Sequence, residues 1–191
     1  MKTVEIIGYK RANLGKVEAK KLRAEAKVPC VLYGGDEQVH FHAPMYLFRE
    51  LLYTPNSYFV ILNIEGTEYR AILQDAQFHP VSDVLMHADF LLLQEGKKVR
   101  MDIPVELEGS APGVIVGGKL VMKVRKLTIT ATPENMPETI KVDVSELELG
   151  KSVKVEAIKP ENYEILNNAQ VSIASVTIPR ALRSKMNEEA E

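Results

Sequence analysis

Apolar and polar residues alternate along most of this chain, and such a period of two predicts β-strands. In the first half, short turns and one longer stretch of charged residues interrupt the alternation. The strands predicted there are residues 3–9, 31–33, 38–42, 58–64, 68–76 and 86–93. Short strands separated by turns favour a barrel or a sandwich.

Two segments of the first half are predicted to be helical. Residues 16–27 consist mainly of Ala, Lys, Glu, Leu and Arg, which are strong helix formers. Pro29 is expected to end this helix, because the residue before a proline is disfavoured in the helical conformation. A second helix is predicted from Pro44, where apolar residues begin to recur at helical spacing. Residues 10–15 show no periodicity and are predicted to form a mobile loop.

A polar segment, residues 94–98, is the natural domain boundary. Beyond it the period of two dominates, with strands predicted at residues 99–107, 120–124, 127–131, 139–144, 152–157 and 171–178. The glycine-rich residues 109–118 match no phosphate-binding motif and are predicted to be a turn. We therefore expect an α+β protein that is mainly β. Its predicted parts are an N-terminal domain (1–94), an all-β C-terminal domain (95–179) and a polar tail (180–191).

Composition narrows the class of protein. Of the 191 residues, 46% are hydrophobic, which is enough to bury a core. No apolar run reaches the roughly 18 residues of a membrane span, and no signal segment opens the sequence. Cys30 is the only cysteine, so an internal disulfide is excluded. These observations favour a soluble, intracellular, globular protein without a membrane partner.

Charge is distributed unevenly along the chain. Residues 1–30 carry eight of the 24 Lys and Arg residues but only three of the 26 Asp and Glu residues. The other 161 residues therefore carry 16 bases and 23 acids. This asymmetry indicates that the N-terminal end contacts a polyanion, although a solvated basic helix would have the same composition.

The predicted helix at residues 16–27 separates its charges by face. At about 100° per residue, four bases share one face: Lys16, Lys20, Arg23 and Lys27. Leu22 lies beside this row, whereas the two acids, Glu18 and Glu25, lie on the far side. Such a helix can pack on its own domain through Leu22 and present the bases to phosphates. The separation favours a nucleic-acid backbone over simple solvation.

Phosphate contacts carry no sequence information, so specificity requires side chains that reach base edges or the groove. The candidates are Tyr33, Gln74, Gln77, His79, His87 and Asp89. His87 and Asp89 point to one face of their predicted strand, where the carboxylate would orient the imidazole. An incidental polar face of a half-buried strand explains the same pattern equally well.

Other chemistries remain open. His40 and His42 share one strand face, and His87 and Asp89 share another, which makes a hydrolytic metal centre conceivable. The sequence contains no HExxH pair, and a metal centre leaves the basic helix without a role. Cys30 has no neighbouring histidine and is a poor candidate nucleophile. A protein-binding adaptor would explain the acidic half but not the basic one.

Several runs of residues occur together in this chain. In the first half these are Gly15-Lys16, Lys20-Lys21-Leu22-Arg23, Pro29, Tyr33-Gly34-Gly35, Gln74-Asp75-Ala76-Gln77-Phe78-His79-Pro80 and His87-Ala88-Asp89-Phe90. In the second half they are Ala111-Pro112-Gly113 and Val142-Asp143-Val144-Ser145. Together they resemble the bacterial large-subunit ribosomal proteins that bind 5S rRNA, in the long form called general stress protein Ctc. The resemblance extends to about Pro179.

The resemblance implies a structural component of the large ribosomal subunit, in the cytoplasm, rather than an enzyme. It implies no cofactor and no small-molecule substrate; the partners would be 5S rRNA and neighbouring large-subunit ribosomal proteins. The first domain would be a β-barrel similar to the anticodon-binding domain of glutaminyl-tRNA synthetase. The RNA contacts implied are Arg11, Lys16, Lys20, Lys21, Arg23, Tyr33, Gln74, Gln77, His87 and Asp89.

The sequence departs from the family pattern in places. Lys20 stands where arginine is frequent, which replaces a bidentate phosphate contact by a point charge. Phe78 also stands at a frequent arginine position. Gln74 and Gln77 are three residues apart and cannot share a face of a regular strand. If both contact RNA, a bulge or turn must precede His79.

Overall fold

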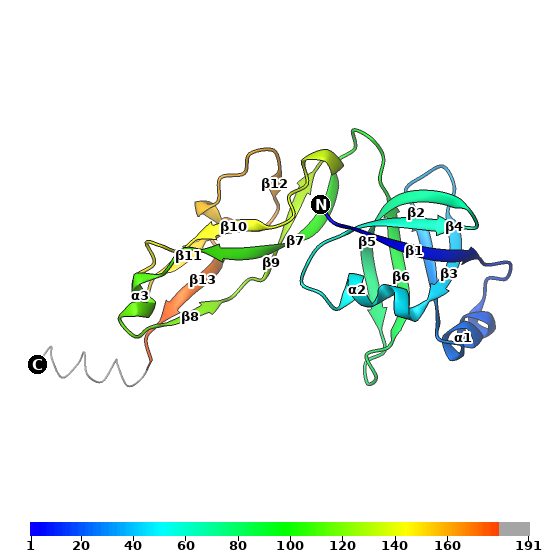
Figure 1. Cartoon of the computed structure of the whole chain (residues 1–191), viewed down its shortest axis with the longest axis horizontal. Helices are drawn as coiled ribbons and strands as arrows, with labels where there is room; N and C mark the ends of the chain where they lie inside the picture. Colours follow the sequence, from blue (N-terminus) through cyan, green and yellow to red (C-terminus); the bar gives the residue numbers. More distant parts are fainter. Residues whose placement is uncertain (180–191) are drawn as a thin grey trace, which may run out of the picture. The chain divides into compact units, whose positions relative to one another are not determined.

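The computed structural model describes residues 1–179, which form two compact units rich in strands (Figure 1). The first unit contains Met1–Val99 and Thr132–Glu138, and the second contains Arg100–Ala131 and the described residues from Thr139 to 179. The predicted α+β class, mainly β, is confirmed. The predicted tail at 180–191 lies outside the described residues.

Six strands of the first unit close into a barrel, which confirms the N-terminal barrel. They are β1 (Thr3–Lys10), β2 (Lys27–Tyr33), β3 (Val39–Pro44), β4 (Phe59–Ile64), β5 (Thr67–Phe78) and β6 (Leu85–Leu92). Their order is β1-β3-β2-β6-β5-β4, and parallel pairing of β1 with β4 closes the ring (Figure 1). Val4 and Ile6 of β1 are buried between exposed neighbours, as expected for a strand with one face toward the core and the other toward solvent.

Three phenylalanine rings fill the barrel core. Phe90 lies 5.9 Å from Phe41 and 6.3 Å from Phe48, measured between ring centroids, and all three side chains are buried. Phe48 comes from η1 (Met45–Phe48), which continues into α2 (Arg49–Leu52). The helix predicted from Pro44 is therefore two short helical turns. Its apolar residues recur at helical spacing because they cover the aromatic core.

The basic helix α1 (Lys16–Ala24) is shorter than the predicted helix at residues 16–27. Ala26 adopts a left-handed conformation with φ of 57°, which turns the chain away from the helix axis. Lys27 already pairs with β3, and Pro29 lies buried within β2, so Pro29 does not end the helix. Strand pairing thus overrides the helix propensity of residues 25–27, the last three of the predicted helix.

The second unit contains two small sheets, with the strand orders β10-β7-β9-β12 and β11-β13-β8. Its elements are β7 (Val99–Glu108), α3 (Pro112–Ile115), β8 (Lys119–Met122), β9 (Lys126–Ala131), β10 (Ile140–Asp143), β11 (Ser152–Lys154), η3 (Val155–Ala157), β12 (Glu164–Ile165) and β13 (Ser172–Thr177). A further turn, η2 (Pro133–Asn135), lies in the segment grouped with the first unit.

The second unit differs from prediction in three places. The glycine-rich residues 109–118 contain α3 and are therefore not a simple turn. Gly113 in this helix approaches its neighbours closely, and a Cβ there would lie 2.7 Å from the backbone of Leu149. The strand predicted at 152–157 ends at Lys154 and continues as η3. The strand β12 was not predicted, because its two residues are too few to show a period.

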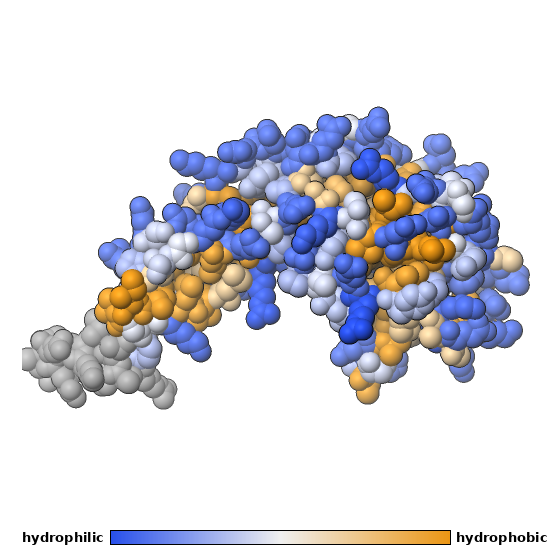
Figure 2. Space-filling view, in the orientation of Figure 1, coloured by the Kyte–Doolittle hydropathy of each residue, from blue (hydrophilic) through white to orange (hydrophobic). Residues whose placement is uncertain are grey.

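Hydrophilic residues cover much of the visible surface of both units (Figure 2). Within residues 1–179, no helix is long and apolar enough to cross a lipid bilayer.

Candidate nucleic-acid interface

Helix α1 presents three exposed lysines from an anchored position. Lys16, Lys20 and Lys21 are exposed, whereas Leu22 is the buried residue of the helix. Arg23 is half-buried, and its Nε donates to the carbonyl oxygen of Met86 in β6 at 3.0 Å. Arg23 therefore fixes the helix to the barrel wall, so that the exposed lysines project from a rigid element.

Lys27 is not part of the basic helix face, contrary to the prediction. It begins β2, and its Nζ lies 2.7 Å from the carboxylate of Glu25, just after the helix. The hydrogen bond and positive charge of Lys27 hold the pKa of the Glu25 carboxyl below its usual value. The row of bases on α1 therefore consists of Lys16, Lys20 and Arg23, because the helix ends before it reaches the fourth base.

A bulge in β5 brings Gln74 and Gln77 to the same face, as the sequence required if both are to contact RNA. Leu73 lies opposite Phe90 in β6, but the next pair is Asp75 opposite Asp89, so Gln74 is an extra residue. Gln77 then lies opposite His87. An extra residue shifts the alternation of side chains by one position. The predicted irregularity before His79 is confirmed, and both glutamines are exposed.

His87 and Asp89 form a contact on the outer face of β6. The Nδ1 atom of His87 lies 2.6 Å from Oδ1 of Asp89, and each side chain is 28% exposed. Within residues 1–179, Oδ1 of Asp89 is buried without a hydrogen-bond partner, so this contact is a close approach of the two side chains rather than a hydrogen bond. The pair offers nitrogen and oxygen atoms on one face of β6 that can form hydrogen bonds with a ligand.

Tyr33 of β2 lies close to two carboxylates on the same wall. Burial raises the pKa of the Tyr33 hydroxyl, and the negative charges of Asp89 and Asp75 raise it further. The hydroxyl therefore stays protonated and can donate a hydrogen bond. Asp75, which is exposed, was absent from the sequence candidates. Only the bulge places it opposite Asp89, and no spacing rule predicts that.

Arg11 is more firmly held than the predicted loop at residues 10–15 implied. Lys10 is the last residue of β1, and its N–H donates to the Glu65 carboxylate at 3.2 Å. The N–H of Arg11 donates to the carbonyl of His40 at 3.0 Å, so the backbone follows β3 for one more residue. The side chain of Arg11 is half-buried. The segment without strand or helix therefore begins at Arg11, but the backbone of Arg11 is still held by β3.

The ten residues implied by the resemblance fall into two groups. Lys16, Lys20, Lys21 and Arg23 lie on α1; Tyr33, Gln74, Gln77, His87 and Asp89 lie on the wall formed by β2, β6 and β5, with Arg11 at the end of β1. The helix packs against β2, which adjoins β6. His79, a further candidate, instead accepts hydrogen bonds from the N–H groups of Val81 and Ser82 at 3.3 Å in the turn after β5.

The histidines do not converge as a metal centre requires. His40 and His42 lie on β3, His87 and Asp89 lie on β6, and β2 runs between the two strands. Two strand spacings separate the pairs by about 10 Å. Within residues 1–179, no three His, Cys, Asp or Glu side chains are placed to share a metal ion.

Cys30 belongs to the core rather than to a reactive site. Its side chain is fully buried, and Sγ donates to the carbonyl of Val28 at 3.4 Å. Burial raises the pKa of the thiol far above its usual value. A buried, protonated thiol is not a nucleophile.

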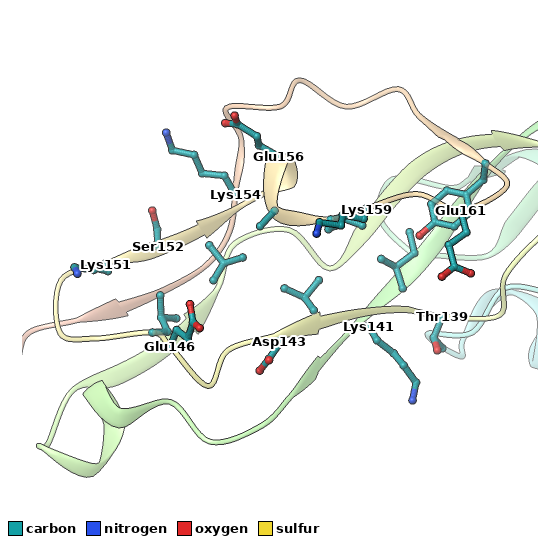
Figure 3. Close-up of a pocket in the computed structure, with 17 residues that line it drawn as sticks. Thr139, Lys141, Asp143, Glu146, Lys151, Ser152, Lys154, Glu156, Lys159 and Glu161 are labelled. Atoms are coloured by element: carbon teal, nitrogen blue, oxygen red, sulfur yellow. The ribbon is translucent and has the colours of Figure 1, made fainter.

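The second unit contains an open groove between β10 and the chain of β11 and η3 (Figure 3). Its charged lining residues are Lys141, Lys151, Lys154, Lys159, Asp143, Glu146, Glu156 and Glu161. Lys151 pairs with Glu148 at 2.6 Å, and Lys154 donates to Gln170 at 2.7 Å. Because this groove has equal numbers of bases and acids, its lining has no net positive charge to attract a phosphate backbone.

Both parts of this chain match known families of ribosomal proteins. Residues 6–90 match the ribosomal L25p family, and residues 98–180 match the C-terminal domain of ribosomal protein TL5. A large ribosomal subunit protein bL25 from Cytophaga hutchinsonii is 55% identical over 185 residues, which cover 97% of this chain and 96% of that protein. The bL25 protein of Amoebophilus asiaticus is 55% identical over 96% of this chain and 94% of its own length. That of Phocaeicola vulgatus is 44% identical over 96% of each chain.

Proposed function

Because this chain belongs to the bacterial bL25 family of large ribosomal subunit proteins, we propose that its barrel binds 5S rRNA through α1 and the outer wall of β2, β5 and β6. Members of this family are structural proteins of the ribosome and not enzymes. The chain is accordingly a structural, rRNA-binding component of the large subunit in the bacterial cytoplasm. The observation that carries the finer proposal is the β5 bulge, which places two glutamines beside the His87–Asp89 pair, on the same barrel that carries the basic helix.

The helix supplies the part of binding that is independent of sequence. Lys16, Lys20 and Lys21 can reach phosphates, because all three are exposed on a helix that Leu22 and Arg23 hold against the barrel. Neutralised phosphates release counterions, which makes binding tight at low salt and weaker as salt rises. Arg23 uses Nε in the protein, and its terminal nitrogens remain able to contact a phosphate.

The strand wall supplies the part of binding that reads RNA. The minor groove of A-form RNA is wide and shallow and exposes 2′-hydroxyls and base edges. Gln74 and Gln77 offer both donors and acceptors, Tyr33 offers a donor, and the His87–Asp89 pair offers an imidazole beside a carboxylate. These five side chains would read the groove, while Arg11 contacts the backbone from the edge of the wall.

For the second unit we propose a neighbouring large-subunit protein as partner. Its groove carries bases and acids in equal number, which suits a polar protein segment better than RNA. In the described residues, β10 at the rim of the groove pairs only with β7, so its other edge can accept a strand. We further propose that the chain divides functionally at residues 94–95, with RNA binding confined to the first part.

A fragment of residues 1–94 is expected to fold and to bind 5S rRNA within about threefold of the affinity of the full chain. All six barrel strands and α1 lie within it. The fragment lacks Thr132–Glu138, which group with the first unit, and with them the ion pair between the N-terminal ammonium and Glu138. Circular dichroism checks folding, and filter binding measures affinity. A folded fragment with no affinity for 5S rRNA would mean that the second unit carries the RNA site.

Replacing Gln74 with Ala is expected to reduce the preference for 5S rRNA over unrelated RNA by about 1–3 kcal/mol while leaving the salt dependence unchanged. Gln74 projects from the bulge and carries no charge, so its loss removes hydrogen bonds but no phosphate contact. Competition binding against tRNA measures the preference. Gln38→Ala, at another exposed position before β3, is the matched control and should change neither quantity. Equal losses of affinity for 5S rRNA and for tRNA would show that Gln74 does not contribute to the preference for 5S rRNA.

A further inference from the structure

A pair of aromatic rings lies on the outer wall of the barrel, outside the residues considered so far. The side chain of Tyr9 in β1 is 53% exposed. Its ring centroid lies 5.8 Å from that of His42 in β3, and the ring planes are 32° apart. Tyr9 and His42 are direct partners in the antiparallel pairing of β1 with β3, so the backbone holds the rings side by side. We call them the aromatic pair.

Strand register places the aromatic pair in line with the residues proposed to read RNA. Gln77 lies opposite His87 across β5 and β6. His42 lies opposite Pro29 of β2; the parallel pairing of β2 with β6 begins at Cys30 opposite Ala88, so Pro29 and His87 each directly precede the first pair. One row of positions therefore crosses the wall from Gln77 to Tyr9. Helix α1 packs against β2, which is the strand between the two halves of this row.

Charged side chains lie near the His42 ring of the aromatic pair. Burial lowers the pKa of His42, the positive charges of Lys27 and Arg11 lower it further, and the negative charge of Glu25, the ion-pair partner of Lys27, raises it. His42 is therefore neutral at pH 7 and stacks as an uncharged ring. Within residues 1–179, neither Nδ1 of His42 nor Nε of Arg11 has a hydrogen-bond partner, although both atoms are buried. This corner of the wall thus combines ring faces, positive charge and unused hydrogen-bonding atoms.

A nucleotide matches this combination in each respect. A base offers a flat face for stacking on an aromatic ring, and its phosphate offers negative charge to neighbouring cations. We propose that Tyr9, supported by His42, stacks on an unpaired base of the bound RNA, and that Arg11 and Lys27 contact the phosphates of that nucleotide. This inference rests on the proposed RNA-binding function and adds a stacking site on β1 and β3 to it.

A single tryptophan can report stacking directly, because the chain contains none. Tyr9→Trp keeps an aromatic face at this position, and its emission is expected to be strongly quenched when 5S rRNA saturates the protein. Tyr46→Trp is the matched control, since Tyr46 is also an exposed tyrosine, 74% accessible, but lies in η1 outside the row. Its emission should change little. Equal responses from both variants would overturn the stacking site.

Affinity measurements give an independent test. Tyr9→Ala is expected to weaken binding to 5S rRNA about 10-fold with an unchanged salt dependence, because a stacking face is lost but no charge. Tyr9→Phe should bind like wild type, and Tyr9→Leu, which keeps apolar bulk on the strand, should lose as much as Tyr9→Ala. If wild type prefers 5S rRNA but Tyr9→Ala and Tyr9→Leu bind it as tightly as wild type does, the stacking site is wrong and the proposed function stands. If wild type itself does not prefer 5S rRNA over tRNA, the proposed function fails and the inference fails with it.

Discussion

Replacing Lys16, Lys20 and Lys21 with Glu is expected to weaken binding to 5S rRNA by roughly 100-fold or more at 0.1 M salt. Each lysine is exposed on α1, so the variant removes three phosphate contacts and adds three negative charges facing the RNA. Removal of three contacts should also reduce the slope of log affinity against log salt by about three. Filter binding at several salt concentrations measures both quantities.

The fold should survive this substitution, because the side chains that anchor the helix remain. Leu22 stays buried, and Arg23 keeps its hydrogen bond to the carbonyl of Met86. A matched control changes Lys119, Lys123 and Lys126 to Glu, three exposed lysines of the second unit, with the same change in net charge. The control should bind 5S rRNA nearly as well as wild type. Equal losses in both variants would show that net charge rather than the helix governs binding.

Replacing Phe90 with Ala is expected to lower the free energy of unfolding of the barrel by about 3–5 kcal/mol. The ring is fully buried and contacts Phe41 and Phe48, so truncation leaves a cavity at the centre of the core. Phe90 also directly follows Asp89 in β6, so loosening this strand should disturb the His87–Asp89 pair. Urea unfolding followed by circular dichroism measures the loss.

Phe78→Ala is the matched control for the core substitution. Phe78 lies at the end of β5 and is 42% exposed, so its truncation should cost about 1 kcal/mol or less. If the two phenylalanine substitutions destabilise the protein equally, the aromatic cluster is not the core of the barrel.

Most of the barrel could be predicted from the sequence, because its strands alternate regularly between a buried and an exposed face. The end of the basic helix could not. Residues 25–27 favour a helix locally, but pairing of Lys27 with β3 draws them into β2. Short elements such as β12 and α3 were also missed, since two to four residues do not establish a period.

The candidate site was predictable in its residue types but not in its geometry. The spacing of Gln74 and Gln77 showed that an irregularity was needed, and the structure places it at Gln74 itself. The spacing gave no indication of Asp75, whose position opposite Asp89 depends on the bulge. Similarly, the pairing of Tyr9 with His42 depends on strand register between β1 and β3, which hydrophobic pattern alone does not determine.

The central claim, that the barrel binds 5S rRNA, is tested most directly by a salt titration of the full chain with 5S rRNA, with tRNA as competitor. Neutralisation of roughly five phosphates predicts a slope of log affinity against log salt of about −4. The account predicts that slope together with binding that excess tRNA does not displace. Displacement by tRNA as effective as by 5S rRNA itself would contradict it.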